Sequence, residues 1–233
     1  MMKKLFILLV LATNVYAQEG VFEINQLCVE TGCFSGDSAG FPITINQPGS
    51  YRFTSNVNIS TNGNGILINS NVSDVTIDLN GFTLQGPVSC SGNPLVCTGP
   101  TNTGNNGRLI VTIGLAENIV IKNGNIRGAV DDGIFINSAY GNLITGINAS
   151  ENRFDGIECN QSCRVIGNSS SRNGEDGISG NARTVIKDNV IFDNAGNGIR
   201  SGICTGNVMI TNEGDNETCL VLVENNICDA SAC

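Results

Sequence analysis

The sequence predicts an all-β solenoid, in which successive coils of the chain stack on one another as parallel strands. Three observations predict it. A short motif ending in Gly-Ile recurs about every 21 residues. Beyond the first 17 residues, no stretch carries an apolar stripe of helix length at the 3.6-residue period. Asn, Gly and Ser separate short segments rich in Ile and Val, as in strands joined by turns.

The repeat is clearest in the second half of the chain, where its Gly residues follow one another at intervals of 23, 21 and 21 residues. Its copies are Asp131-Asp132-Gly133-Ile134, Phe154-Asp155-Gly156-Ile157, Glu175-Asp176-Gly177-Ile178 and Gly196-Asn197-Gly198-Ile199, with an earlier copy at Gly63-Asn64-Gly65-Ile66. Asn recurs four residues after most of these glycines (Asn69, Asn137, Asn160, Asn181) and four residues before three of them (Asn152, Asn173, Asn194). Because coils stack about 4.8 Å apart, we expect each set to form a column, with Ile in the core and Asn amides bonded from rung to rung.

The N-terminal residues 1–17 have the features of a signal peptide. Lys3 and Lys4 precede the apolar run 5–12, and Val15-Tyr16-Ala17 forms a small-x-small cleavage signal. The apolar run is shorter than the about 20 residues that cross a bilayer. We therefore expect export, to the periplasm or the extracellular space, without a membrane anchor.

The rest of the chain divides into three parts. Residues 18–40 are expected to cap the first coil, residues 41–225 to form the coils, and residues 226–233 to form a disulfide-tied tail. Within the coils, the stretch 87–107 is rich in Gly, Pro, Asn and Thr and predicts a long loop. Such a loop either roofs a binding groove or is an insertion without a binding role.

All ten Cys lie after the predicted signal peptide, and an even number in an exported protein predicts five disulfides. The spacing favours the local pairs Cys28–Cys33, Cys90–Cys97, Cys159–Cys163, Cys204–Cys219 and Cys228–Cys233. A zinc site is the alternative. The spacings lack the paired CxxC form, and the chain has no His.

Charge and composition exclude several functions. Without the signal peptide the chain carries 10 basic and 21 acidic residues, so its net charge is −11. This disfavours nucleic acid, anionic membranes and polyanionic polysaccharides, unless a cation bridges the last of these. The absence of His excludes Ser-His-Asp and Cys-His catalysis.

The repeats resemble those of right-handed parallel β-helix proteins with the pectin-lyase-like fold. The resemblance rests on DGIFIN, DGIECN and NGIRS, which alternate with NLITGINASEN, CRVIGNSSSRN and TVIKDNVIFDN, and it covers about residues 40–225. It implies a right-handed parallel β-helix. The repeat count predicts about seven coils, and the cysteines predict disulfides that tie the ends of the helix. Activity does not carry over. Of the NTD, DD, GHG and RIK blocks of polygalacturonase-like enzymes only Asp131-Asp132 matches, and the DPH block of alginate epimerases has no counterpart.

The column of Asp132, Asp155 and Asp176, which Asn197 extends, is the candidate site for chemistry. Carboxylates one rung apart could bind Ca²⁺, or act as the acid and nucleophile of a glycosidase. A lyase would also need a base, for which Lys187 is the candidate. The simpler explanation is that Asp and Asn are preferred before Gly in these turns, because their side chains accept bonds from local backbone N–H groups. Asn in place of Asp at positions 64 and 197 favours this simpler explanation.

A second column, outward-facing and one residue beyond each Gly-Ile, holds Phe135, Glu158, Ser179 and Arg200. We take Phe135, Glu158 and Arg200 as its ligand-binding candidates. The acidic charge and missing His favour an exported binding or surface module, most plausibly for a polysaccharide or cell-surface glycan, that requires no cofactor. The alternative is a polysaccharide lyase or glycoside hydrolase that uses the Asp column, with Ca²⁺ as the ion it could take.

Overall fold

The computed structural model describes residues 20–101, 106–137, 140–222 and 225–228. The predicted signal peptide and Cys233 lie outside these residues. Within the described part, no helix is long and apolar enough to cross a membrane.

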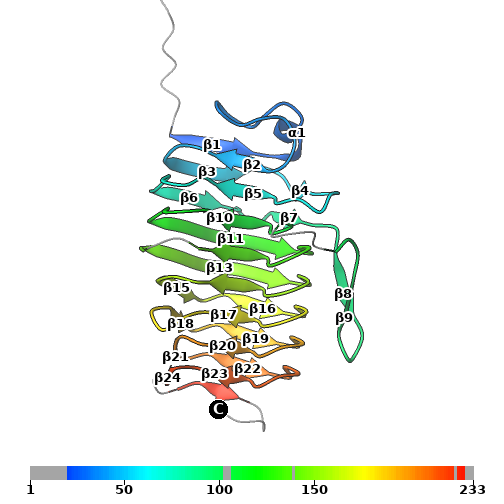
Figure 1. Ribbon diagram of the computed structural model, residues 1–233, viewed down its shortest axis with the longest axis vertical. Helices are drawn as coiled ribbons and strands as arrows, with labels where there is room; N and C mark the ends of the chain where they lie inside the picture. The colour runs from blue at the N-terminus through cyan, green and yellow to red at the C-terminus, as the bar shows by residue number, and fades with distance from the viewer. Residues whose placement is uncertain (1–19, 102–105, 138–139, 223–224, 229–233) are drawn as a thin grey trace, which may run out of the picture.

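Stacked coils form a parallel β-helix, visible along the long axis of the molecule in Figure 1. One of its sheets, here sheet B, has eight strands, one from each coil. They are β2 (Ile43–Ile45), β5 (Ile66–Ile68), β10 (Ile110–Thr112), β12 (Ile134–Ile136), β14 (Ile157–Cys159), β17 (Ile178–Ser179), β20 (Ile199–Arg200) and β23 (Glu217–Thr218). The prediction of about seven coils is therefore confirmed to within one coil.

The other large sheet, sheet A, has fifteen strands in two rows joined at a bend. The first row contains β1 (Val21–Ile24), β3 (Gly49–Phe53), β6 (Val75–Asp78), β11 (Ile119–Arg127), β13 (Asn142–Ser150), β15 (Cys163–Ile166), β18 (Val185–Lys187), β21 (Ile203–Thr205) and β24 (Val221–Leu222). The second row contains β4 (Val57–Asn58), β7 (Thr83–Gln85), β16 (Ser169–Ser171), β19 (Val190–Phe192), β22 (Val208–Ile210) and β25 (Ile227–Cys228), and β11 and β13 run through both rows. The helix α1 (Gln26–Val29) lies at the N-terminal end of the stack (Figure 1).

The core consists of the columns that the repeat predicts. Ile134, Ile157, Ile178 and Ile199 pair in register on successive strands of sheet B, and all four are 0% exposed. Ile and Val columns supply most of the apolar core, because their branched side chains stack well on a pleated surface. Same-phase residues are therefore neighbours in space, as the repeat requires.

Buried Asn side chains form two ladders at the bends. In one, each Nδ2 donates to the next Oδ1 at 2.9–3.0 Å, through Asn152, Asn173, Asn194 and Asn212. In the other, the same bond runs at 3.0–3.1 Å through Asn168, Asn189, Asn207 and Asn226. These bonds let the chain bury amides that the turns bring into the core, at little cost.

Four of the five predicted disulfides are present, namely Cys28–Cys33, Cys90–Cys97, Cys159–Cys163 and Cys204–Cys219. The partner predicted for Cys228 is Cys233, which lies outside the described residues. The predicted loop 87–107 contains a hairpin of two antiparallel strands, β8 (Ser89–Ser91) and β9 (Val96–Thr98). The hairpin leaves the stack and lies along the side of the coils that follow (Figure 1).

Candidate active site on the acidic column

The predicted Asp column lies in the turn through which the chain enters each strand of sheet B. Each member stands two residues before the first residue of its strand, so the strand register places the members on successive rungs. In order along the axis they are Asn64, Arg108, Asp132, Asp155, Asp176, Asn197 and Asp215.

One oxygen of each carboxylate holds the neighbouring coil. The Oδ1 atom of Asp132 accepts from the backbone N of Asp155 at 3.2 Å, and that of Asp155 accepts from Asp176 N at 2.9 Å. The Oδ1 atom of Asp176 accepts from Asn197 N at 2.7 Å. The column is therefore part of the architecture, as the simpler explanation of the sequence pattern holds.

The second oxygen of each carboxylate faces one of two arginines, Arg108 or Arg200. Arg108 Nε lies 3.1 Å from Oδ2 of Asp132. Arg200, from the outward column, reaches back over the rungs, with Nη2 3.3 Å from Asp155 Oδ2 and Nε 2.6 Å from Asp176 Oδ2. The three Asp residues are only 2–5% exposed, whereas the Arg200 side chain is 50% exposed. Thus each carboxylate has both a structural and an outward-directed oxygen.

Burial and mutual repulsion change the protonation of two of these carboxylates. Burial, followed by the charges of Asp176 and Asp132, raises the pKa of Asp155 to about 8. Burial and the charge of Glu158 raise the pKa of Asp132 to about 6, although Arg108 opposes this shift. Both carboxyl groups therefore keep their protons to a higher pH than an ordinary Asp, and Asp155 keeps its proton to a higher pH than Asp132.

These side chains line an open groove with a volume of about 320 Å³. Its lining residues are Arg108, Asp131, Asp132, Phe154, Asp155, Glu158, Glu175 and Arg200. Five carboxyl groups and two guanidinium groups make it acidic. On its rim Arg108 lies over the ring of Phe135, with Cζ 3.8 Å from the ring centroid.

A cation could be held by only part of the predicted Ca²⁺ set. Asp132, Asp155 and Glu158 each place a carboxylate oxygen within 4.8 Å of the other two. Asp176 stands outside this group, and its Oδ2 is held by Arg200. Carboxylate oxygens are the ligands that Ca²⁺ prefers, so the donors fit the ion in kind.

The groove unites the two residue sets that the sequence treats separately. Asp132 and Asp155 line it together with the outward-facing Glu158 and Arg200, and Asp176 is joined to it through Arg200. Phe135 contacts Arg108 at the edge. Lys187 is not brought to them. It lies on β18 of sheet A, exposed, with Nζ 3.7 Å from Asp188 Oδ2.

Sequence reasoning missed Arg108, Phe154 and Glu175 as parts of the groove. Arg108 shares the phase of the Asp column, two residues before Ile110, and that spacing is the signal that could have found it. Phe154 and Glu175 directly precede Asp155 and Asp176, so the same turn carries them to the groove.

Solved structures resemble this chain in fold. The pectate lyase Pel9A matches with a TM-score of 0.53 and 14% identity, over 83% of this chain and 53% of that one. A double mutant of the periplasmic alginate epimerase AlgG matches with a TM-score of 0.53 and 15% identity, over 78% and 48%. The chain thus spans about half the length of each.

No protein-family model matches the chain, and no curated protein matches it. At 14–15% identity the structural similarities establish fold and not activity. They confirm the right-handed parallel β-helix of the pectin-lyase-like type.

Proposed function

We propose that the protein is an exported polysaccharide-acting protein that binds a glycan in the acidic groove and hydrolyses its glycosidic bonds. The observation that carries the proposal is the pair of carboxyl groups of Asp155 and Asp132, which are 2% and 4% exposed and place oxygens within 4.8 Å of each other. This burial and proximity raise the pKa of Asp155 to about 8 and that of Asp132 to about 6. A neutral carboxylic acid beside a carboxylate is what glycoside hydrolysis requires. The four disulfides support export, because such bonds persist in oxidising compartments.

In this reaction Asp155 is the general acid that protonates the leaving-group oxygen, and Asp132 is the carboxylate that attacks or stabilises the anomeric carbon. An oxygen of each lies within 4.8 Å of an oxygen of the other, so the pair is closely spaced, as in retaining enzymes, whose carboxyl groups stand about 5–5.5 Å apart, and unlike inverting ones, where the separation is about 6.5–9.5 Å. We therefore expect the product to keep the anomeric configuration of the substrate. The rate should be highest between about pH 6 and 8, where Asp132 has lost its proton and Asp155 keeps it.

A neutral glycan is the substrate class that the charge of the groove favours. Five carboxyl groups against two arginines repel a uronate chain. A lyase would in addition need a base and a cation for the substrate carboxylate. Ca²⁺ on Asp132, Asp155 and Glu158 would cancel most of the negative charge of the groove, so the assay is run with and without Ca²⁺.

A second candidate function is glycan binding without turnover. Two observations favour it: the Oδ1 atoms of the column are committed to backbone bonds, and Arg200 covers the outward oxygens of Asp155 and Asp176. In that case the carboxylates of the column stabilise the stacking of the coils, and the groove binds the glycan without cleaving it.

The test is an assay of the purified protein against neutral, pectic and alginate glycans, with and without Ca²⁺. We expect new reducing ends from a neutral glycan, and a rate at least about 100-fold lower for Asp155→Asn, the usual effect of removing a general acid. Asn fits this position, because Asn197 makes the equivalent backbone bond to Asp215 at 2.9 Å. The control is Asp188→Asn, on an exposed turn of sheet A.

Three outcomes decide between the alternatives. Unsaturated products absorbing in the ultraviolet would identify a lyase and reject hydrolysis. Glycan binding with no product under any condition would reject hydrolysis and support the function of glycan binding without turnover. Turnover that Asp155→Asn does not reduce would remove the column from the chemistry.

A further inference from the structure

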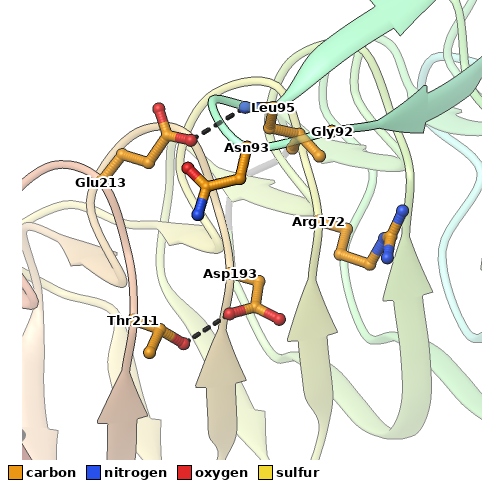
Figure 2. Close-up of a pocket in the computed structure, with 7 residues that line it drawn as sticks. All are labelled: Gly92, Asn93, Leu95, Arg172, Asp193, Thr211 and Glu213. Atoms are coloured by element: carbon orange, nitrogen blue, oxygen red, sulfur yellow. Dashed lines mark hydrogen bonds between the residues drawn. The ribbon is translucent and has the colours of Figure 1, made fainter.

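We propose that a second saccharide-binding site, distinct from the acidic groove, lies between the tip of the β8–β9 hairpin and the coils beside it. A pocket with a volume of about 240 Å³ opens there. Gly92, Asn93 and Leu95 of the hairpin line one wall, and Arg172, Asp193, Thr211 and Glu213 of three successive coils line the other (Figure 2).

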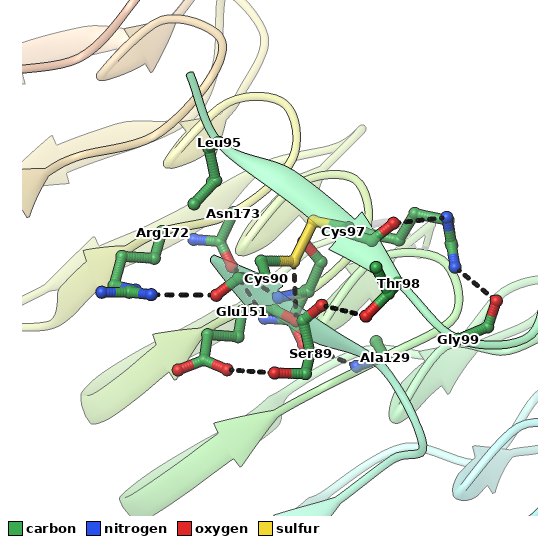
Figure 3. Close-up of a disulfide and its surroundings, with 12 residues drawn as sticks. Ser89, Cys90, Leu95, Cys97, Thr98, Gly99, Ala129, Glu151, Arg172 and Asn173 are labelled. Atoms are coloured by element: carbon green, nitrogen blue, oxygen red, sulfur yellow. Dashed lines mark hydrogen bonds between the residues drawn. A yellow bond between two sulfur atoms is a disulfide. The ribbon is translucent and has the colours of Figure 1, made fainter. Parts of the chain in front are cut away.

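The hairpin wall is fixed to the coils by several contacts. The backbone N of Leu95 donates to Oε1 of Glu213 at 2.9 Å, and Arg172 Nη2 donates to the carbonyl of Cys90 at 2.9 Å. Arg153 holds the far end of the hairpin, through the carbonyls of Gly99 at 2.9 Å and Pro100 at 2.8 Å. The Cys90–Cys97 disulfide joins the two strands of the hairpin (Figure 3). The pocket is thus preorganised, which lowers the entropic cost of binding.

The polar groups around the pocket are of mixed kind. Asp193 and Glu213 bring carboxylate oxygens, Arg172 brings a guanidinium, and Asn93 brings an amide that Figure 2 shows directed toward the space between Glu213 and Asp193. Within the described residues no ion pair joins Arg172 to either carboxylate. One oxygen of Asp193 accepts from the Thr211 hydroxyl and one oxygen of Glu213 accepts from Leu95 N. The other oxygen of each carboxylate is therefore available to a ligand that offers both donors and acceptors.

A sugar ring is the ligand that meets these demands. Each hydroxyl can donate to Asp193 or Glu213 and accept from Arg172 or Asn93, and the half-buried Leu95 offers apolar contact to ring C–H groups. An anion would meet two carboxylates, and a cation would meet Arg172. The volume is below the about 300–1,000 Å³ of sites for drug-sized ligands, so the pocket fits a single sugar residue.

Titration with methyl glycosides of glucose, galactose and mannose tests the proposal, with binding followed through backbone amide shifts in NMR spectra. We expect at least one glycoside to shift the amides of Asn93 and Leu95. Asn93→Ala and Asp193→Asn should each weaken that binding about tenfold, which corresponds to the loss of one hydrogen bond to a charged or well-placed group.

The controls separate this site from folding and from the acidic groove. Asp193 and Asp188 both have a left-handed backbone, with φ of 56° and 55°, which Asn tolerates. Asp188→Asn should therefore leave binding unchanged. Asp155→Asn should also leave it unchanged, so that failure of the proposed hydrolysis and failure of this site are distinguishable. Absence of amide shifts with every glycoside, or equal affinity in Asn93→Ala, would overturn the proposal.

Discussion

At the scale of single residues, the carboxylates of the acidic column each perform two tasks. The Oδ1 atom of Asp155 accepts the backbone N–H of the next rung, while its Oδ2 faces Arg200 and the groove. Because the backbone bond fixes the side chain, the outward oxygen is held in place without further support. The structural and the chemical interpretations of the Asp column are therefore compatible.

The raised pKa of Asp155 predicts how stability depends on pH. The folded protein keeps this proton up to about pH 8, whereas the unfolded chain loses it near the ordinary value of 3.8. Between these values the folded state binds more protons, so the free energy of unfolding should fall as pH rises. Asp132, with a pKa of about 6, adds a contribution of the same sign up to that pH.

Thermal melts between pH 5 and 8.5 measure this dependence. We expect Tm to decrease across the range, and the decrease to be smaller in Asp155→Asn, which cannot ionise. Asp188→Asn, on an exposed turn, should retain the full decrease. A Tm that rises with pH, or the same slope in Asp155→Asn, would show that this carboxyl group is ionised in the folded protein.

At the scale of elements, the buried Asn ladders hold the bends of successive coils together. Asn189 donates to the carbonyl of Val165 and to Oδ1 of Asn207, both at 3.0 Å, and its own Oδ1 accepts from the N and Nδ2 of Asn168. It is 0% exposed, so no water can replace these partners. We expect Asn189→Ala to lower the free energy of unfolding by roughly 2–4 kcal/mol, because it leaves buried polar groups unpaired.

Chemical denaturation of paired variants tests the ladder. The matched change is Asn148→Ala, at an exposed position of β13, where the amide makes a single bond of 3.4 Å to Asn125. That variant should lose at most about 0.5 kcal/mol, as is usual for surface changes. Equal losses in the two variants would mean that the ladder adds nothing beyond an ordinary Asn side chain.

The same scale explains which parts of the site could be predicted from sequence. Asp132, Asp155 and Asp176 are visible because each sits at one phase of a regular repeat, and so are the outward Glu158 and Arg200. Arg108 has the same phase, but the insertion at 87–107 precedes it and Leu109 stands where the motif has Gly. The interrupted repeat hides its place in the column.

Other features depend on long side chains and on distant contacts. Phase places Arg200 one rung beyond Asp176, but the reach of its guanidinium back to Asp155 depends on the conformation of its long side chain, which phase does not determine. The docking of the hairpin rests on contacts such as Leu95 with Glu213, which are 118 residues apart. No local pattern encodes them, and hence the sequence left the role of the loop open between a groove roof and an insertion.

At the scale of the whole molecule, the β-helix behaves as a one-dimensional stack in which each interior coil contacts the coils before and after it. Sheet B shows this, since each strand from β5 to β20 pairs with two neighbours of the stack. Stability should then be close to a sum of coil and interface contributions. Removal of one complete coil should preserve every column.

Deletion of residues 178–198 tests this additivity, because it removes 21 residues, the period of the repeat. Ile199 then follows Gly177 and takes the place of Ile178, while Asn207 and Asn212 replace Asn189 and Asn194 in the ladders. We expect a folded protein with strand-type circular dichroism and one cooperative thermal transition at a somewhat lower Tm. The hairpin loses its exposed contact with Glu213, which adds little to the change.

The matched variant lacks residues 178–188, which is about half a coil. Its remaining segment, 189–198, is too short to pass through both sheets, so the Ile and Asn columns lose their register on every later rung. We expect it to unfold without a cooperative transition, although it retains more of the chain than the full-coil deletion. If instead both variants melt alike, stability does not depend on column register, and the proximity of Asp132 and Asp155 would need another cause than the stacking of equal phases.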